Sequence, residues 1–148
     1  MSPLTEPQVR QISALVAARR LVEVDPDPAR CEAFLRLAED TISDVVHVRL
    51  PQNRYNLAYD SAHAVGEAMI ARHGLRTTNG QGQHEALARF LRIVFDRPPD
   101  DAHARHVDRM RRARNQMHDD ARPVSTTDAD QAVATATALL AVAKDDAP

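Results

Sequence analysis

Residues 109–120 read RMRRARNQMHDD, and this stretch decides how the rest of the chain is interpreted. Apolar Met110, Ala113 and Met117 recur at spacings of three and four, the period of an α-helix with one buried face. The other face carries arginines and ends in His118, whose imidazole titrates near neutral pH. The stretch therefore predicts an amphipathic helix with a concentrated positive charge.

If this helix continues through His118, three polar side chains share one stripe. A turn of about 100° per residue puts Arg114 and His118 within about 40° of each other, with Arg111 on the same stripe. Arg112 falls roughly on the opposite side, close to the buried edge. Two fork-shaped guanidinium groups beside one imidazole suit a phosphodiester. Arg109 and Arg112 are further candidates for binding, together with Arg111.

Cleavage of RNA without a metal needs only a few groups of this kind. A base takes the 2′-hydroxyl proton, an acid protonates the departing 5′-oxygen, and cations surround the phosphorane. One histidine cannot be base and acid in the same step. Two copies of the chain could divide the roles across a dimer axis, so a nuclease interpretation implies a homodimer with a composite site, no metal and no cofactor.

The step from Arg114 to Asn115, followed closely by His118 near the end of the penultimate helix, resembles the signature of HEPN domains. Many HEPN proteins are metal-independent ribonucleases or toxins, built as dimeric up-and-down helical bundles with paired Arg and His at the dimer cleft. The resemblance implies that His118 is the general base or acid and that Arg114 stabilises the scissile phosphate. Asn115 would orient the site, Arg111 would assist, and a toxin would imply an antitoxin partner.

The spacing departs from the family pattern, which places four to six residues between the Arg and the His. Three residues separate Arg114 from His118, whereas five and six separate it from Arg112 and Arg111. Some HEPN toxins carry a Tyr two residues after the His that a partner nucleotidyltransferase modifies, and Asp120 occupies that position here. The stretch is also similar to an actinobacterial HEPN-like subgroup, reading approximately Arg-Arg-x-Arg-Asn-x-x-Glu-Tyr, which lacks the His.

A second hypothesis is therefore a non-catalytic HEPN-like module that binds nucleic acid, a nucleotide or an acidic protein partner. Asp119 and Asp120 favour it, because carboxylates next to a phosphate site oppose anion binding unless they point away. A helical adaptor that uses the face of Phe90 and Phe95 is a third hypothesis. The chain has eighteen Arg and one Lys, so the basic face is also compatible with an ordinary solvated surface.

The composition favours one helical domain spanning residues 1–148, with a core of Ala, Leu and Val, since the chain has no Trp and few other aromatic residues. The net charge of −2 means that RNA binding would have to come from the local basic patch at 103–118. Cys31 is the only cysteine, which excludes an intrachain disulfide and a Cys-based zinc site. Without a convincing signal peptide or a membrane-spanning stretch, we expect a cytoplasmic protein that does not contact membranes.

Apolar periodicity and Pro, Gly and capping signals predict six helices: 7–22, 28–48, 51–73, 84–95, one from Asp100 or Asp101 to about 117–119, and one from about 125 to 143. No alternating pattern supports a sheet. The fold class is all-α, an up-and-down antiparallel bundle of five to six helices. Gly66 within the third helix predicts a close helix crossing, and the fourth helix, with two of the three Phe, is expected at the centre of the core or in a dimer contact.

Three further patterns have two interpretations each. Asp60 and His63, one helical turn apart, are an intrahelical pair or an acid–base couple. Residues 77–82, TTNGQG, predict a connecting loop and lack the ending of a phosphate-binding loop. His103 and His106 have the spacing of two metal ligands but no third ligand at a matching interval, so they more simply extend the polar face toward Arg114.

Overall fold

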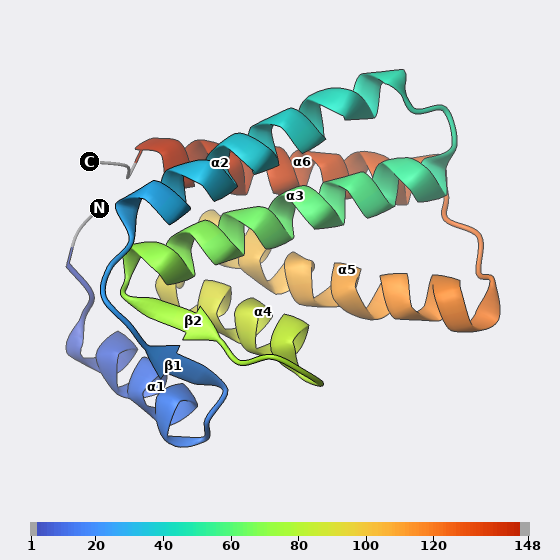
Figure 1. Ribbon diagram of the computed structural model, residues 1–148. Helices are drawn as coiled ribbons and strands as arrows, with labels where there is room; N and C mark the ends of the chain where they lie inside the picture. The colour runs from blue at the N-terminus through green and yellow to red at the C-terminus, as the bar shows by residue number, and fades with distance from the viewer. Residues whose placement is uncertain (1–2, 146–148) are drawn as a thin grey trace.

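The computed structural model describes residues 3–145 and confirms an all-α helical bundle (Figure 1). Its helices are α1 (Glu6–Ala17), α2 (Pro28–Ser43), the short 3-10 helix η1 (Asp44–His47), α3 (Pro51–Arg72), α4 (Gln83–Val94), α5 (Asp100–Asp120) and α6 (Thr126–Asp145). Two three-residue strands, β1 (Leu21–Glu23) and β2 (Leu75–Thr77), complete the described elements. In Figure 1, α2 and α3 run side by side in opposite directions, and α5 and α6, which also contact each other, run in opposite directions too.

The helix ends follow from local sequence signals. Thr5 caps α1 through a capping box with Gln8, and Asp27 accepts a hydrogen bond from the Arg30 amide at 2.9 Å to cap α2. The Ser125 hydroxyl accepts from the Asp128 amide at 3.0 Å, which caps α6 as the sequence predicted. The bounds of α3, α4 and α6 agree with the predicted helices to within a few residues.

The prediction that the chain has no sheet is wrong between the first two helices. The first helix ends at Ala17 rather than residue 22, and Arg19 adopts a positive φ of 59° that turns the chain out of the helix. β1 then pairs antiparallel with β2, with Leu21 opposite Thr77 and Glu23 opposite Leu75. Strands of three residues are too short to show an alternating pattern, and this pairing joins distant parts of the chain.

The predicted second helix is also shorter than expected. Its α-helical part ends at Ser43, whose hydroxyl donates to the Glu39 carbonyl at 2.8 Å, and residues 44–47 tighten into the 3-10 helix η1. Val46 is consequently 81% exposed instead of lying on the apolar stripe of a longer helix.

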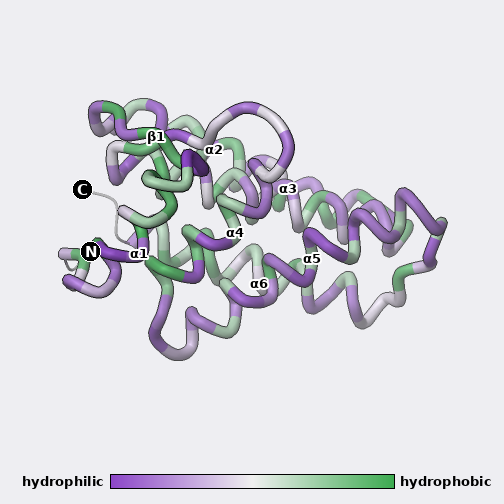
Figure 2. The backbone as a smooth tube through the Cα atoms, turned by 90° about the horizontal axis from the view of Figure 1, so that it is seen from below, coloured by the Kyte–Doolittle hydropathy of each residue, from purple (hydrophilic) through white to green (hydrophobic). Residues whose placement is uncertain are grey.

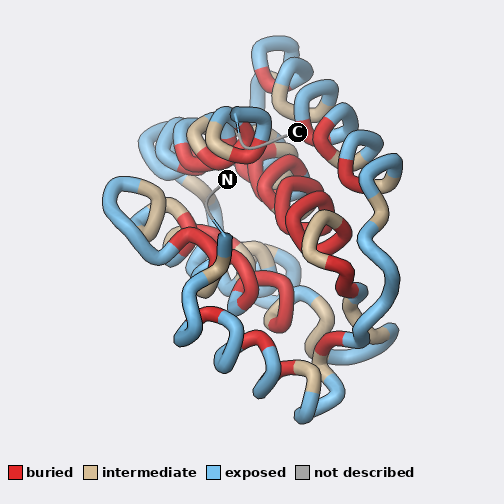
Figure 3. The backbone as a smooth tube through the Cα atoms, turned by 90° about the vertical axis from the view of Figure 1, so that its left-hand side faces the viewer, coloured by how far each residue is buried: buried red, intermediate tan, exposed pale blue. Residues whose placement is uncertain are grey.

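The central helix of the bundle is α3 rather than α4, for which we expected either the centre of the core or a dimer contact. Most of α3 from Tyr55 onward is buried, while α2, α4, α5 and α6 pack around it (Figures 1 and 3). α4 still contributes fully buried Leu87, Phe90 and Leu91 to the core. The core draws on all six α-helices of the described chain, and it is built largely from Ala, Leu and Val.

The close crossing expected at Gly66 is confirmed. A Cβ at this position would lie 2.7 Å from Leu87 Cγ, well inside van der Waals contact. Because glycine leaves this space open, α4 packs directly on the middle of α3. The first residues of α4 are thereby placed beside α3 and α5, where the polar side chains described below converge.

Figure 2 shows that α5 is hydrophilic along much of its length, in contrast to the apolar faces that meet in the core. Within residues 3–145, no helix is both long and apolar enough to cross a membrane.

Candidate functional site

The functional stretch 109–120 lies in the second half of α5, which continues through His118 to Asp120 as the stripe of polar residues requires. Met110 is fully buried, and Ala113 and Met117 are partly buried against the core. The apolar face predicted from the sequence is therefore the packed face. Its position fixes where the arginines of the same helix point.

Arg111 and Arg114 line one cleft of about 520 Å³ together with Asn115. We call this the Arg–His cleft. Its other lining residues come from α3 and from the start of α4 with the loop before it: Tyr59, Gly80, Gln81, Gly82, Gln83, His84 and Glu85. Three of the residues predicted from the sequence are thus brought together in one concave site.

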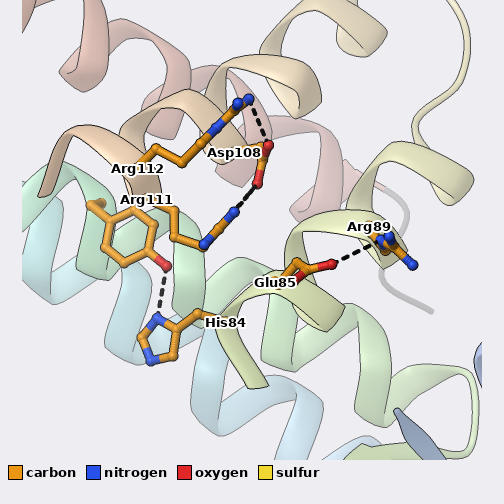
Figure 4. Close-up of polar contacts among 7 residues, drawn as sticks. His84, Glu85, Arg89, Asp108, Arg111 and Arg112 are labelled. Atoms are coloured by element: carbon orange, nitrogen blue, oxygen red, sulfur yellow. Dashed lines mark hydrogen bonds and ion pairs between the residues drawn. The ribbon is translucent and has the colours of Figure 1, made fainter. Parts of the chain in front are cut away.

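Arg114 is anchored on α3. Its Nη1 donates to Asp60 Oδ1 at 2.6 Å, and its guanidinium carbon lies 5.2 Å from the centre of the Tyr59 ring. Arg111 donates to Asp108 Oδ1 at 3.0 Å (Figure 4). Each arginine of the cleft is therefore paired with one carboxylate while its remaining N–H groups stay available for a ligand.

The second aromatic component of the cleft is His84, which the sequence analysis did not single out. Its Nδ1 lies 2.8 Å from the Tyr59 hydroxyl, and its ring centre lies 4.4 Å from that of His63. The hydrogen bond of His84 is drawn as a dashed line in Figure 4. Tyr59 and His63 are four residues apart on α3, so one turn of that helix supports the His84 ring.

Burial determines the protonation of these three groups. Desolvation lowers the pKa of His63 to about 4, and the neighbouring His84 and Arg114 act in the same direction. Burial likewise lowers the pKa of His84, assisted by Arg114 and Arg111 and opposed by Asp60. The pKa of Tyr59 is raised to about 12 by burial. At neutral pH the cleft therefore holds the neutral imidazole of His84 and the protonated phenol of Tyr59, with the neutral His63 ring beside them.

The loop 77–82 connects β2 to α4, and its residues Gly80 and Gly82 also line the Arg–His cleft. Gly82 precedes α4 with φ of 92°, and no side chain caps this end of the helix. The first amides of α4 are consequently left without side-chain partners at the edge of the cleft.

His118 is exposed in the last turn of α5 and is not among the residues that line the Arg–His cleft. It lies one turn beyond Arg114, a rise of about 6 Å along the helix axis. The structure thus places the predicted proton-transfer residue on the same helix as the arginines but beyond the cleft of its own chain.

Arg112 does not lie close to the buried edge, as the sequence analysis proposed. Its side chain is 62% exposed and pairs with Asp108 Oδ2 at 2.8 Å (Figure 4). Arg109 is exposed on another side of α5. Burial raises the pKa of Tyr55, which the charge of Arg109 opposes, and burial lowers the pKa of His106, which Arg109 reinforces. Neither arginine lines the Arg–His cleft.

The predicted pair of Asp60 and His63 does not form, because Asp60 pairs with Arg114 and the His63 ring lies tilted beside that of His84. His103 and His106 both approach the buried Thr135 hydroxyl, at 3.5 and 2.6 Å. Across residues 3–145, no group of three or more His, Cys, Asp or Glu side chains is arranged to hold a metal ion.

Comparison with family models, with curated proteins and with solved structures finds no match for this chain.

Proposed function

We propose that this protein is a HEPN-like, metal-independent endoribonuclease that acts as a homodimer and binds the scissile phosphate of RNA in the Arg–His cleft. One observation carries the proposal: Arg111 and Arg114 open together onto a cleft that also contains Asn115 and an imidazole. Guanidinium forks suit the oxygens of a phosphodiester, and their positive charge stabilises the phosphorane that forms during cleavage.

In this proposal Arg114 holds the phosphate, Arg111 assists and Asn115 orients the ribose or the phosphate. Asp60 occupies only one guanidinium nitrogen of Arg114, which leaves donors for phosphate oxygens. The half-buried setting of Arg114 against Tyr59 restricts its side chain, so less conformational freedom is lost when RNA binds.

In this proposal His118 acts as general acid or base only in the assembled dimer. Because it is exposed near the end of α5, it is accessible to a second copy of the chain. A composite site would combine the cleft of one copy with His118 of the other, so that acid and base come from different groups. Antitoxin or nucleotidyltransferase partners belong to the same proposal, although Asp120 offers no tyrosine for modification.

The test is cleavage of a labelled RNA oligonucleotide by purified protein in EDTA. Arg114→Ala and His118→Ala should each lower the rate by at least about 100-fold, the scale of one lost general acid–base or charge-stabilising group. Arg10→Ala, which removes an exposed arginine on α1, is the control and should cut normally. Absence of cleavage by folded wild-type protein would contradict the ribonuclease proposal.

The second candidate function is a non-catalytic binding module for nucleic acid or a nucleotide. The observation in its favour is that Asp60 and Asp108 already pair with the two cleft arginines. In that case wild type binds the oligonucleotide without cutting it, and His118→Ala barely changes affinity. Loss of Arg111 and Arg114 together would weaken binding and flatten its dependence on salt.

A further inference from the structure

The hydrogen bond between Tyr59 and His84 suggests a role that the sequence pattern around α5 did not reveal. Its 2.8 Å length fixes His84 Nδ1 against a phenol from the buried face of α3, since Tyr59 is only 1% exposed. A flexible surface histidine has no such constraint. The His84 ring stacks near that of Tyr59, with ring centres 5.9 Å apart, and lies 4.4 Å from the ring centre of His63.

This arrangement leaves the other ring nitrogen of His84 for the cleft. Nδ1 is occupied by Tyr59, whereas Nε2 has no hydrogen-bond partner within the described chain and is not among its buried unpartnered atoms. His84 lines the same cleft as Arg111 and Arg114. His84 and the two arginines therefore line the same cleft, and Nε2 is the ring nitrogen that no group of the described chain occupies.

Burial lowers the pKa of His84, Arg114 and Arg111 of α5 lower it further, and Asp60 of α3 acts in the opposite direction. His84 is therefore neutral at pH 7, which is the form that a general base needs at the start of the reaction. His63, which stacks beside it, stays neutral at pH 7 because burial holds its pKa at about 4. A neutral His84 can accept a proton there, and Asp60 stabilises the resulting imidazolium.

We propose that His84, oriented by Tyr59, takes the 2′-hydroxyl proton in the ribonuclease reaction, an assignment that rests on the function proposed above. The proton moves to Nε2 while the 2′-oxygen forms a bond to phosphorus. The bond from phosphorus to the 5′-oxygen breaks, leaving a 2′,3′-cyclic phosphate. His118 of the second copy donates a proton to the departing 5′-oxygen. Exchange with water then removes the proton from His84 and restores one to His118.

The mechanism requires one tautomer of the His84 ring. For Nε2 to be the base, Nδ1 must carry the hydrogen and donate it to the Tyr59 oxygen. The imidazolium that forms after proton transfer keeps the same hydrogen bond. Tyr59 is therefore a positioning residue: it selects the tautomer and holds the ring in place through both protonation states.

The experiment compares His84→Gln, Tyr59→Phe and the control His47→Gln, which alters an exposed histidine of η1. Cleavage of the RNA oligonucleotide is measured in EDTA from pH 5 to 9. Binding is measured separately with an oligonucleotide that has a 2′-deoxy sugar at the cleavage position and cannot be cut. Nitrogen-15 NMR of the wild type reports the His84 tautomer.

We expect His84→Gln to lower the cleavage rate by at least about 100-fold while binding the deoxy analogue within about twofold of wild type. Tyr59→Phe should reduce the rate and lower the population of the Nδ1–H tautomer, and His47→Gln should match wild type. Wild-type cleavage that His84→Gln leaves unchanged would overturn the role of His84 but not the ribonuclease function. The role of His84 as the base is also overturned if His84→Gln weakens binding of the deoxy analogue as much as it lowers the cleavage rate. It is overturned as well if NMR shows the proton of wild-type His84 on Nε2. A wild type that does not cut RNA overturns both proposals.

Discussion

Substitution of Gly66 by alanine tests the packing that places α4 against α3. The new Cβ would lie 2.7 Å from Leu87 Cγ, and Leu87 is 1% exposed, so its side chain has little room to rotate away. Inserting a methyl group into a packed core costs about 1–3 kcal/mol. Alanine recovers about 0.5–1 kcal/mol through its higher helix propensity.

The balance is a destabilisation of about 1–2 kcal/mol, which for a chain of this size lowers Tm by about 3–8 °C. Urea unfolding followed by circular dichroism measures the free energy directly. Since Leu87 lies one turn after His84 on α4, the same substitution should also shift the His84 NMR signals.

A double-mutant cycle with Leu87→Ala provides the control. Leu87→Ala alone should cost about 2–5 kcal/mol, because it opens a cavity beneath α3. In that background the Gly66→Ala methyl enters vacated space, so it should be neutral or stabilising, with a favourable coupling of about 1–3 kcal/mol. If Gly66→Ala raises stability equally in both backgrounds, the close approach of α3 and α4 is wrong.

Three further predictions concern single residues. Burial lowers the pKa of His63 in the folded protein to about 4, whereas in the unfolded chain it stays near 6.5. As the pH falls below 6.5, His63 is protonated in the unfolded chain but not in the folded one, so the free energy of unfolding should be about 2 kcal/mol lower at pH 5 than at neutral pH. His63→Gln should remove that part of the pH dependence in urea unfolding; an unaltered profile would contradict the buried neutral imidazole. Asp60→Asn removes the carboxylate that pairs with Arg114. It should tighten binding of the deoxy oligonucleotide several-fold, as measured by fluorescence anisotropy at low salt. Weaker binding would instead mean that Asp60 holds Arg114 in position. Thr5→Ala breaks the capping box of α1 and should lower the free energy of unfolding by about 1 kcal/mol, with Ser13→Ala on the same helix as a control expected to change it little.

The helices themselves were largely predictable because their signals are local. The spacing of Met110, Ala113 and Met117 gave the buried face of α5, and the structure keeps Arg111 and Arg114 on one side of that helix. Gly66 indicated a close crossing for the same reason: a glycine inside a helix disfavours the helix unless a neighbour needs the space. Where the local signal was short, as at β1 and β2, the prediction failed.

Half of the Arg–His cleft could be predicted from α5 alone, and the other half could not. Arg111, Arg114 and Asn115 follow each other at helical spacing, whereas Tyr59 and His84 are 25 residues apart and meet only because α3 and α4 cross. No sequence period encodes such a contact. In the same way, Asp60 pairs with Arg114 rather than with its own neighbour His63 because α5 packs against α3.

The sequence by itself determined the helical class, the buried face of each long helix and the arginines that α5 presents, because each depends on residues within one or two turns. The tertiary structure alone decided which helix lies at the centre and that Arg112 turns to solvent. It also decided that a histidine from α4 joins the arginines of α5. Those outcomes depend on which faces pack together, and packing is a property of the whole chain.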